Sequence, residues 1–183
     1  MPINLVIESA AWRKIPKLEA RLQKAAAVTL EHLPAKFRFP VSANLLLTSD
    51  AAIRKLNRDF RGKDKPTNVL SFPQFEPRQL SKMGKEKVPV EVGDIVIAYQ
   101  YMVVQAKENH KILLNHVIHL MIHGLLHLFG YDHISNSEAG IMERLEQRIM
   151  KELGLPDPYK ELPVRGTPPK KTKRKARNKR TRP

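Results

Sequence analysis

Four short segments of the chain show the alternating or continuous apolar pattern that predicts β-strands. They are Ile3–Ile7, Val41–Thr48, Val69–Phe72 and Asp94–Ala98. The polar stretch over residues 74–93 carries three Lys, two Pro and two Gly, and this composition predicts a loop. We therefore expect the four strands to form one small sheet.

Apolar residues at helical spacing predict five helices around these strands. Their expected ranges are Pro16–Leu33, Ala51–Phe60, Tyr99–Asn109, Lys111–Phe129 and a last helix that begins after Ser135. This arrangement of strands and helices predicts an α+β fold, in which a small mixed β-sheet packs with several helices.

Local residues indicate where the helices begin and end and which side faces the core. Asp50 is placed to cap the second helix and Gly62 to end it. Ser135 and Glu138 form the capping box of the last helix. The core faces expected for the first and the last helix are Leu18, Leu22, Ala25, Thr29 and Leu33, and Ile141, Met142, Leu145, Ile149 and Leu153.

The charge of the chain is concentrated at its C-terminal end. The 183 residues carry a formal net charge of +15, with 33 Lys and Arg against 18 Asp and Glu. Ten of the 33 basic residues lie in residues 163–183, which contain no Asp or Glu. We therefore expect one folded domain over residues 1–160 and a disordered basic tail over residues 161–183. Such a tail is suited to contact nucleic acid by counterion release, and the alternative is a solubilising extension.

The composition excludes several classes of protein. The chain has no Cys, and therefore no disulfide, no thiolate nucleophile and no Cys-ligated metal cluster.

The most apolar stretch, Ile112–Phe129, contains four His and an Asn and is too polar for a lipid-exposed helix. The N-terminus lacks a basic region followed by a long apolar run, which argues against a secretory signal. We expect a cytoplasmic protein without a membrane partner.

Six of the seven His lie between His110 and His133, and three of them have the spacing of metal ligands. His123 and His127 are four residues apart and so lie on one face of the predicted helix. Gly130 is placed to form the left-handed turn that brings His133 to the same point. Three nitrogen ligands with one open position are typical of a catalytic zinc site, although nickel, copper and iron accept such ligands too. We expect one Zn²⁺ per chain.

The pattern His-x-x-x-His-x-x-Gly-x-x-His is also that of metzincin metalloproteases, with one difference. In those enzymes a Glu follows the first His and serves as general base, whereas this chain has Gly124 there. Gly124 cannot accept a proton, which disfavours a protease. The alternative without metal chemistry is three His that pack or hydrogen-bond on a helix. His116 is expected on the helix surface.

Two segments resemble the YbeY family of bacterial endoribonucleases, also called rRNA maturation factors. The segment HGLLHLFGYDH, residues 123–133, closely resembles the signature of that family, and LNRDFRGKDKPTNVLSFP, residues 56–73, resembles a second family block. The segments Gly93–Ile95 and Met142–Glu146 also fit. The resemblance covers residues 3–159 and excludes the tail.

The resemblance implies a zinc-dependent, single-strand-specific endoribonuclease that matures the 3′ end of small-subunit rRNA and takes part in ribosome quality control. It implies His123, His127 and His133 as the zinc ligands and Arg61 as the essential basic residue. The planar guanidinium of Arg61 is suited to stabilise the negative charge of a phosphodiester transition state. The implied partners are single-stranded RNA, rRNA and the small ribosomal subunit.

Five further residues have two interpretations each. Thr67, Asn68 and Ser71 either hydrogen-bond RNA or form a capped turn that leads into a strand. Asp132 either orients a ligand imidazole or belongs to the turn, and His119 either supports the metal ligands or packs in the core. The sequence identifies no general base and leaves open whether water or the RNA 2′-hydroxyl attacks.

Three functions follow from these observations. The endoribonuclease in rRNA processing is favoured. A ribosome-assembly or RNA-binding factor with a mainly structural metal is the first alternative. A metzincin-like metalloprotease is the second, and Gly124 counts against it.

Overall fold

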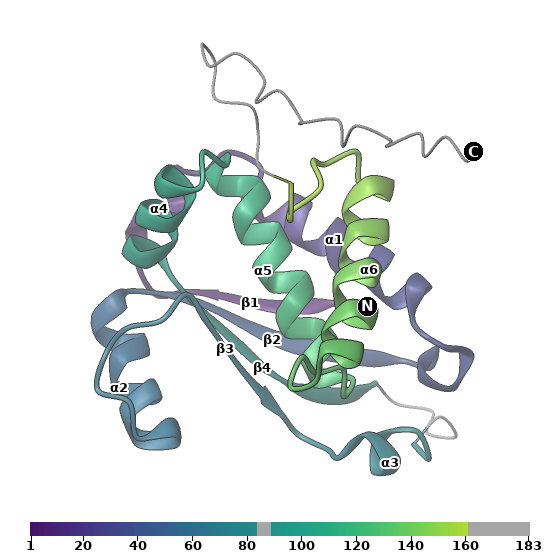
Figure 1. Cartoon of the computed structure of the whole chain (residues 1–183). Helices are drawn as coiled ribbons and strands as arrows, with labels where there is room; N and C mark the ends of the chain where they lie inside the picture. The colour runs from purple at the N-terminus through teal and green to yellow at the C-terminus, as the bar shows by residue number, and fades with distance from the viewer. Residues whose placement is uncertain (84–88, 161–183) are drawn as a thin grey trace, which may run out of the picture.

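The computed structural model describes residues 1–83 and 89–160, so the expected basic tail lies outside the described residues. Four strands form one sheet in the order β1-β2-β4-β3 (Figure 1). The strands are β1 (Ile3–Ile7), β2 (Val41–Thr48), β3 (Val69–Pro73) and β4 (Val90–Ala98). β1, β2 and β4 are parallel, whereas β3 is an antiparallel edge strand beside β4. The mixed sheet confirms the expected α+β fold.

The helices cover the two faces of this sheet unequally (Figure 1). α1 (Leu18–His32), α5 (Leu113–Leu128) and α6 (Asn136–Glu152) lie over one face, and α2 (Asp50–Arg61) lies against the other. α4 (Tyr99–Glu108) connects β4 to α5. Short helical turns complete the described chain: η1 (Ala10–Lys14), η2 (Ala35–Phe37) and α3 (Pro77–Leu80).

α5 is the central helix of the larger core. Most of its residues are buried, because it packs between the sheet and the helices α1, α4 and α6. The core face predicted for α1 is confirmed, since all five of its residues are buried. Among the described residues no single helix is long and apolar enough to cross a membrane, and α4 and α5 meet that criterion only as a pair bent by 113°.

The loop predicted over residues 74–93 is wrong in two places. α3 lies within it, and β4 begins at Val90 instead of at Asp94. Val90 and Val92 are buried on alternate positions, as in a strand. Gly93 lies inside β4, and glycine is needed there because β3 passes very close. A Cβ on Gly93 would lie 2.2 Å from the carbonyl oxygen of Phe72. The glycine that suggested a loop is thus required for strand pairing.

The cap predicted for α2 is also wrong by one residue. Ser49 is the N-cap, and its hydroxyl accepts a hydrogen bond from the Ala52 N–H at 3.4 Å. Asp50 instead serves a different helix, because its Oδ1 accepts the Tyr101 N–H at 2.9 Å in the first turn of α4. Gly62 ends α2 in the left-handed conformation, with φ of 66°, as predicted.

The core face predicted for α6 is confirmed except at Ile141 and at Leu153, which follows the helix and is only partly buried. Met142, Leu145 and Ile149 are buried, whereas Ile141 is 50% exposed. Ile141 instead borders an open groove on the surface, together with Arg144 and Arg148 of α6. The predicted capping box of Ser135 begins the helix.

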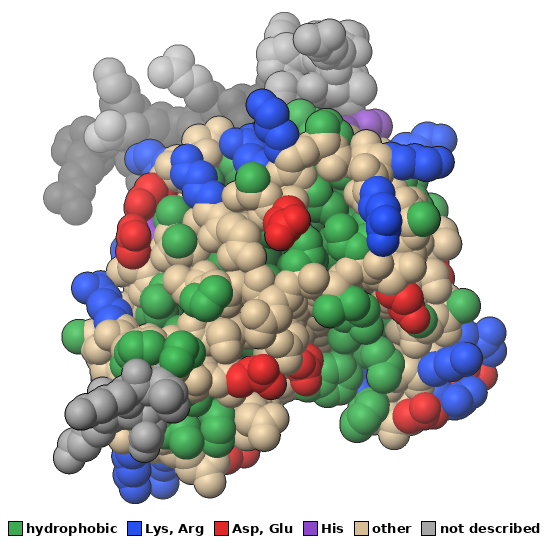
Figure 2. All heavy atoms as spheres, turned by 180° about the vertical axis from the view of Figure 1, so that it is seen from behind, with side chains coloured by type: hydrophobic (Ala, Val, Ile, Leu, Met, Phe, Trp, Pro, Cys, Tyr) green, Lys and Arg blue, Asp and Glu red, His purple; other side chains and the backbone are tan. Residues whose placement is uncertain are grey.

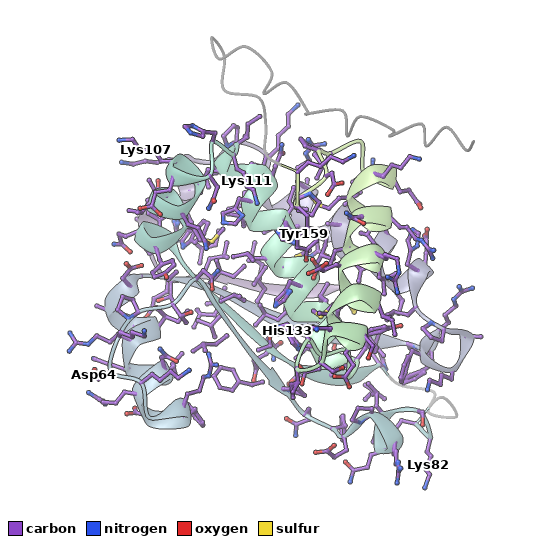
Figure 3. The ribbon with its side chains drawn as sticks, viewed as in Figure 1. Asp64, Lys82, Lys107, Lys111, His133 and Tyr159 are labelled. Carbon is purple, nitrogen blue, oxygen red and sulfur yellow. The ribbon has the colours of Figure 1, made fainter. Side chains whose placement is uncertain are left out.

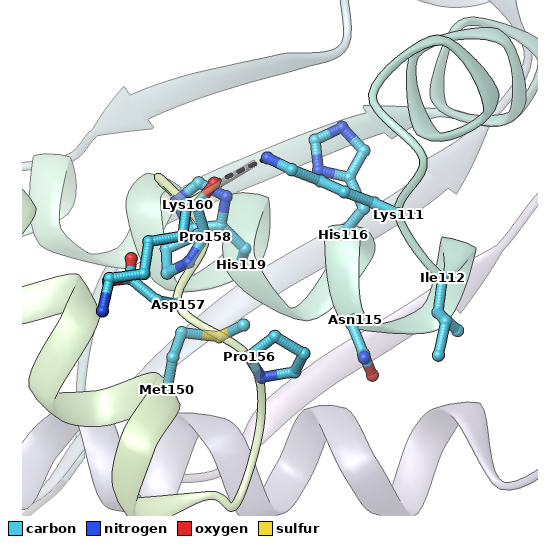
Figure 4. Close-up of a pocket in the computed structure, with 10 residues that line it drawn as sticks. All are labelled: Lys111, Ile112, Asn115, His116, His119, Met150, Pro156, Asp157, Pro158 and Lys160. Carbon is cyan, nitrogen blue, oxygen red and sulfur yellow. Dashed lines mark hydrogen bonds and ion pairs between the residues drawn. The ribbon is translucent and has the colours of Figure 1, made fainter. Parts of the chain in front are cut away.

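A small cavity of about 40 Å³ lies between the start of α5 and the segment after α6 (Figure 4). His116 and His119 line it, and His116 is buried, contrary to the expectation of a surface position. The Nε2 of His116 donates to the Gln105 Oε1 at 2.9 Å, which joins α5 to α4. Burial, together with the nearby charges of Lys111 and His119, lowers the pKa of His116 to about 4.

We expect His116 to make the protein less stable in mild acid. Its pKa is about 4 in the folded chain and 6.5 in the unfolded chain, so the unfolded chain binds the proton first as the pH falls. The contribution of neutral His116 to the free energy of unfolding is complete above pH 6.5 and is lost progressively towards pH 4. The loss amounts to about 2 kcal/mol between about pH 7 and about pH 5. His116→Gln keeps a donor for Gln105 and should reduce this slope. Urea unfolding of both proteins at the two pH values measures the effect, and equal slopes would contradict it.

Candidate active site

α5 and the turn after it bring three imidazoles to one point. His123 and His127 lie one turn apart on α5, and their Nε2 atoms are 3.1 Å apart. His133 completes the group, in which one nitrogen of each ring lies within 4.8 Å of the others. Two nitrogen ligands of a tetrahedral zinc ion lie about 3.3–3.4 Å apart, given Zn–N distances of about 2.0–2.1 Å. The donor set therefore fits a metal with three His ligands, as the sequence predicted.

Gly130 forms the predicted turn for two reasons. Its φ of 83° is in the left-handed region, and its N–H donates to the His127 carbonyl at 2.9 Å. In addition, a Cβ on Gly130 would lie 2.2 Å from the Cγ of Pro77 in α3. Both the backbone conformation and the contact with α3 therefore require glycine between His127 and His133.

Glu146 is the residue of the site that the sequence did not single out. It is fully buried on α6, where its Oε1 accepts the His123 Nδ1–H at 2.9 Å and its Oε2 accepts the His119 Nε2–H at 2.8 Å. The Tyr159 hydroxyl also donates to Oε2. Because Nδ1 of His123 carries the proton, Nε2 is free to bind a metal. The available signal was a carboxylate on the core face of α6, next to the buried Leu145.

The protonation states in this network favour metal binding. Burial would raise the pKa of Glu146, but the hydrogen bonds from His119, His123 and Tyr159 lower it to about 2, so the carboxylate is charged. Burial, and then the proximity of the other two imidazoles, lowers the pKa of His127. The neutral form, which is the form that binds metals, is therefore the stable form of His127 near neutral pH.

The three imidazoles line a cleft of about 580 Å³ between α5, β3 and the end of α2. Figure 3 shows His133 near the start of α6, beside the edge of the sheet. The cleft brings together nearly all the residues that the sequence proposed: Arg61, Thr67, Asn68, Ser71, His123, His127, Asp132 and His133. Residues from four separate segments of the chain thus face one opening.

Arg61 is the last residue of α2 and is exposed in this cleft. The other two arginines of α2 are paired, Arg54 with Asp64 at 2.8 Å and Arg58 with Asp59 at 2.9 Å. Arg61 has no ion-pair partner among the residues that the structure describes. Its guanidinium is therefore available to bind an anion in the cleft.

The remaining candidates make contacts of different kinds. Asn68 accepts the Val69 N–H at 2.8 Å and donates to Gln105 at 3.1 Å, as in a capped turn. Asp132 accepts the backbone N–H of His133 at 2.7 Å and so contributes to the turn. His119 lies behind the cleft and reaches it only through Glu146.

Gly124 has a packing role at the position of the protease glutamate. A Cβ there would lie 3.0 Å from the Cγ2 of Ile95 and 3.1 Å from the Oγ of Ser71. A side chain at this position would push α5 away from β3 and β4. The chain thus has neither a base nor the room for one at this point, which weighs against the metzincin reaction.

Comparison with known proteins accounts for these features together. The family model described as Endoribonuclease YbeY matches residues 7–154, which include all three imidazoles, Arg61 and Glu146. The chain belongs to the YbeY family. The family assignment agrees with the segments of sequence that resemble it, and Tyr159 lies just beyond the match.

Individual relatives support the same assignment. The Endoribonuclease YbeY of Bradyrhizobium diazoefficiens is 42% identical over 160 residues, which are 87% of this chain and 86% of that protein. The Endoribonuclease YbeY of Nitrobacter hamburgensis is 50% identical over 156 residues, 85% of this chain and 80% of that protein. The solution structure of TM1509 from Thermotoga maritima is similar in fold, with a TM-score of 0.50, 25% identity and coverage of 87% of this chain and 99% of that one.

We expect Gly130→Val to weaken both folding and metal binding. The left-handed backbone alone costs a β-branched residue about 1–2 kcal/mol, and the contact with Pro77 adds to this cost. Gly154→Val is the matched control, because Gly154 has φ of 69° but no atom within 4 Å of the position of a Cβ. Thermal unfolding and zinc titration compare the two. The requirement for glycine at position 130 is contradicted if both variants lose the same stability and both keep full zinc affinity.

Proposed function

We propose that this protein is a zinc-dependent, single-strand-specific endoribonuclease that acts in the cytoplasm on rRNA. The proposal rests on membership in the YbeY family. The observation that carries it is the position of Arg61 in the same cleft as His123, His127 and His133. An arginine suited to bind phosphate and three imidazoles suited to bind a metal line one cleft, and this is the pairing that phosphodiester cleavage needs.

The residues present suit zinc. Three His nitrogens form the donor set, and the hydrogen bond to Glu146 orients the imidazole of His123. Zinc held by these ligands would supply a Lewis acid that polarises a phosphoryl oxygen. The described residues provide only these three clustered ligands, so one position is left for substrate or water.

The chain itself supplies binding and orientation. Arg61 is suited to hold the scissile phosphate with two parallel N–H bonds and to stabilise the additional charge of the transition state. The Thr67 and Ser71 side chains line the wall of the same cleft. The cleft volume of about 580 Å³ and the exposed arginine suit an unpaired strand whose backbone enters the cleft.

The role in rRNA maturation is the finer part of the proposal. It follows from the family resemblance, which implies the 3′ end of small-subunit rRNA as substrate and the small ribosomal subunit as partner. The net charge of +15 favours a polyanionic partner of this kind. A ribosome-assembly factor with a structural metal would bind the same RNA but leave it uncut.

We expect about one zinc per chain and cleavage of single-stranded RNA that depends on it. His127→Ala should lose most of the metal and most of the cleavage while keeping RNA binding. Elemental analysis, together with cleavage of a labelled single-stranded RNA with and without chelator, measures both properties. A substrate with one 2′-deoxynucleotide at the cleaved linkage tells whether the 2′-hydroxyl attacks. Equal metal content in both proteins would reject the ligand assignment, and metal binding without cleavage would favour the assembly factor.

Arg61→Ala should reduce cleavage strongly, by about 100-fold or more, with nearly unchanged folding and zinc content. Arg61→Lys should recover only part of this loss, because an ammonium group cannot form the bidentate contact. Arg58→Ala is the matched control, since Arg58 is on the same helix and is paired with Asp59. Single-turnover rates compare the four proteins. Full activity of Arg61→Ala would make Arg61 an ordinary surface charge.

A further inference from the structure

Phe60 is an exposed aromatic residue in the last turn of α2, next in sequence to Arg61 of the cleft. It is 68% exposed, more than any other aromatic residue that the structure describes. Its ring contacts the ring of Phe72 in β3 at an angle, with the centroids 5.1 Å apart and the planes at 63°. This contact supports the Phe60 ring from one side and leaves most of its surface open.

The position of Phe60 follows from the way α2 packs. Phe60 continues the apolar stripe of Ile53 and Leu56, which pack in the smaller core between α2 and the sheet. Burial decreases along this stripe, from the fully buried Ile53 to the exposed Phe60. The last turn of α2 therefore extends away from the core, and it carries Phe60 together with Arg61.

The surroundings of Phe60 are those of a nucleic-acid contact. The next residue, Arg61, lines the cleft, and Lys63 and Lys65 follow in the exposed loop. Figure 2 shows hydrophobic side chains gathered beside the charged side chains at the α2 corner of the molecule. Proteins bind single-stranded RNA by stacking its bases on exposed aromatic rings while cations contact the backbone. An aromatic ring and a free cation on consecutive residues provide both contacts for neighbouring parts of one strand.

We propose that Phe60, supported by Phe72, is a stacking subsite for an unpaired RNA base whose backbone is bound at Arg61. This inference deepens the proposed function, since it takes RNA as the substrate. A phenyl ring stacks on any base, so the subsite accepts single strands without reading their sequence. It excludes bases that are held in a duplex, which gives a structural source for single-strand preference.

A tryptophan placed at this position tests the contact directly. The chain has one Trp, and this Trp12 is fully buried, so Phe60→Trp adds a single exposed indole. Single-stranded RNA added to the chelator-treated variant should quench the new fluorescence. An abasic oligonucleotide of the same length and charge should not. Val6→Trp is the matched control, because Val6 is 56% exposed on β1, at the opposite edge of the sheet.

Measuring how tightly the protein binds RNA tests the same subsite without a new fluorophore. Phe60→Leu should weaken binding of single-stranded RNA by about 5- to 150-fold, the range found for loss of one stacked base. The slope of log affinity against log salt should stay unchanged, whereas Arg61→Ala should reduce it by about 0.7. Thermal unfolding verifies that Phe60→Leu is folded.

The outcomes separate this subsite from the proposed function. Wild-type protein that binds no single-stranded RNA would overturn the proposed function. Wild-type binding with an unquenched Phe60→Trp, or with quenching by the abasic strand, would overturn the subsite alone. A loss of self-association in Phe60→Leu, with unchanged RNA affinity, would assign the exposed ring to a contact between copies of this chain and would also overturn it.

Discussion

The close contact of α5 with β3 and β4 is the constraint on which the other features of this protein depend. At the crossing point Gly124 leaves no space for a side chain, with Ile95 at 3.0 Å and Ser71 at 3.1 Å from the position of a Cβ. Because α5 also packs against α1, α4 and α6, its height above the sheet sets the positions of all three helices. The same contact places His123 and His127, on either side of Gly124, next to the edge strand. Two of the three imidazoles of the site are therefore held by a helix that is packed tightly on the sheet.

The buried carboxylate of Glu146 is the second requirement of this arrangement. A charge in the core is costly unless it is fully hydrogen-bonded, and breaking a buried pair typically costs about 3–5 kcal/mol. Glu146 meets this condition with His119, His123 and Tyr159 as donors. Three segments that are distant in the sequence are thereby joined at one point. The polar His119 on the mostly apolar α5 is thus explained, because it shares Glu146 with His123.

The cleft depends on β3 being an edge strand. α2 and α5 lie on opposite faces of the sheet, so their side chains would be separated by the backbone in the middle of the sheet. At the edge, the end of α2 reaches past the strand, and Arg61 lines the same opening as the imidazoles. The arginine suited to bind an anion and the imidazoles suited to bind a metal thus come from different layers of the fold. The exposed Phe60 is a further consequence of the same geometry, because the turn that carries Arg61 leaves the core.

The sequence by itself determined the local features of the protein. It predicted most helices and strands to within a few residues, together with the His123–His127–His133 group and the turn at Gly130, because each depends on the period of a helix or the conformation of one glycine. Contacts between distant residues became visible only in the folded chain. Glu146 is 23 positions from His123, Asp50 caps a helix that begins far beyond its own, and His116 is buried by segments that its own helix does not predict. The predicted strand over β4 is too short because a glycine in the sequence fits a loop as well as a strand. Only the folded chain shows that Gly93 lies against Phe72 of the neighbouring strand. Local patterns specify backbone conformation, whereas burial and proximity depend on which distant segments pack together.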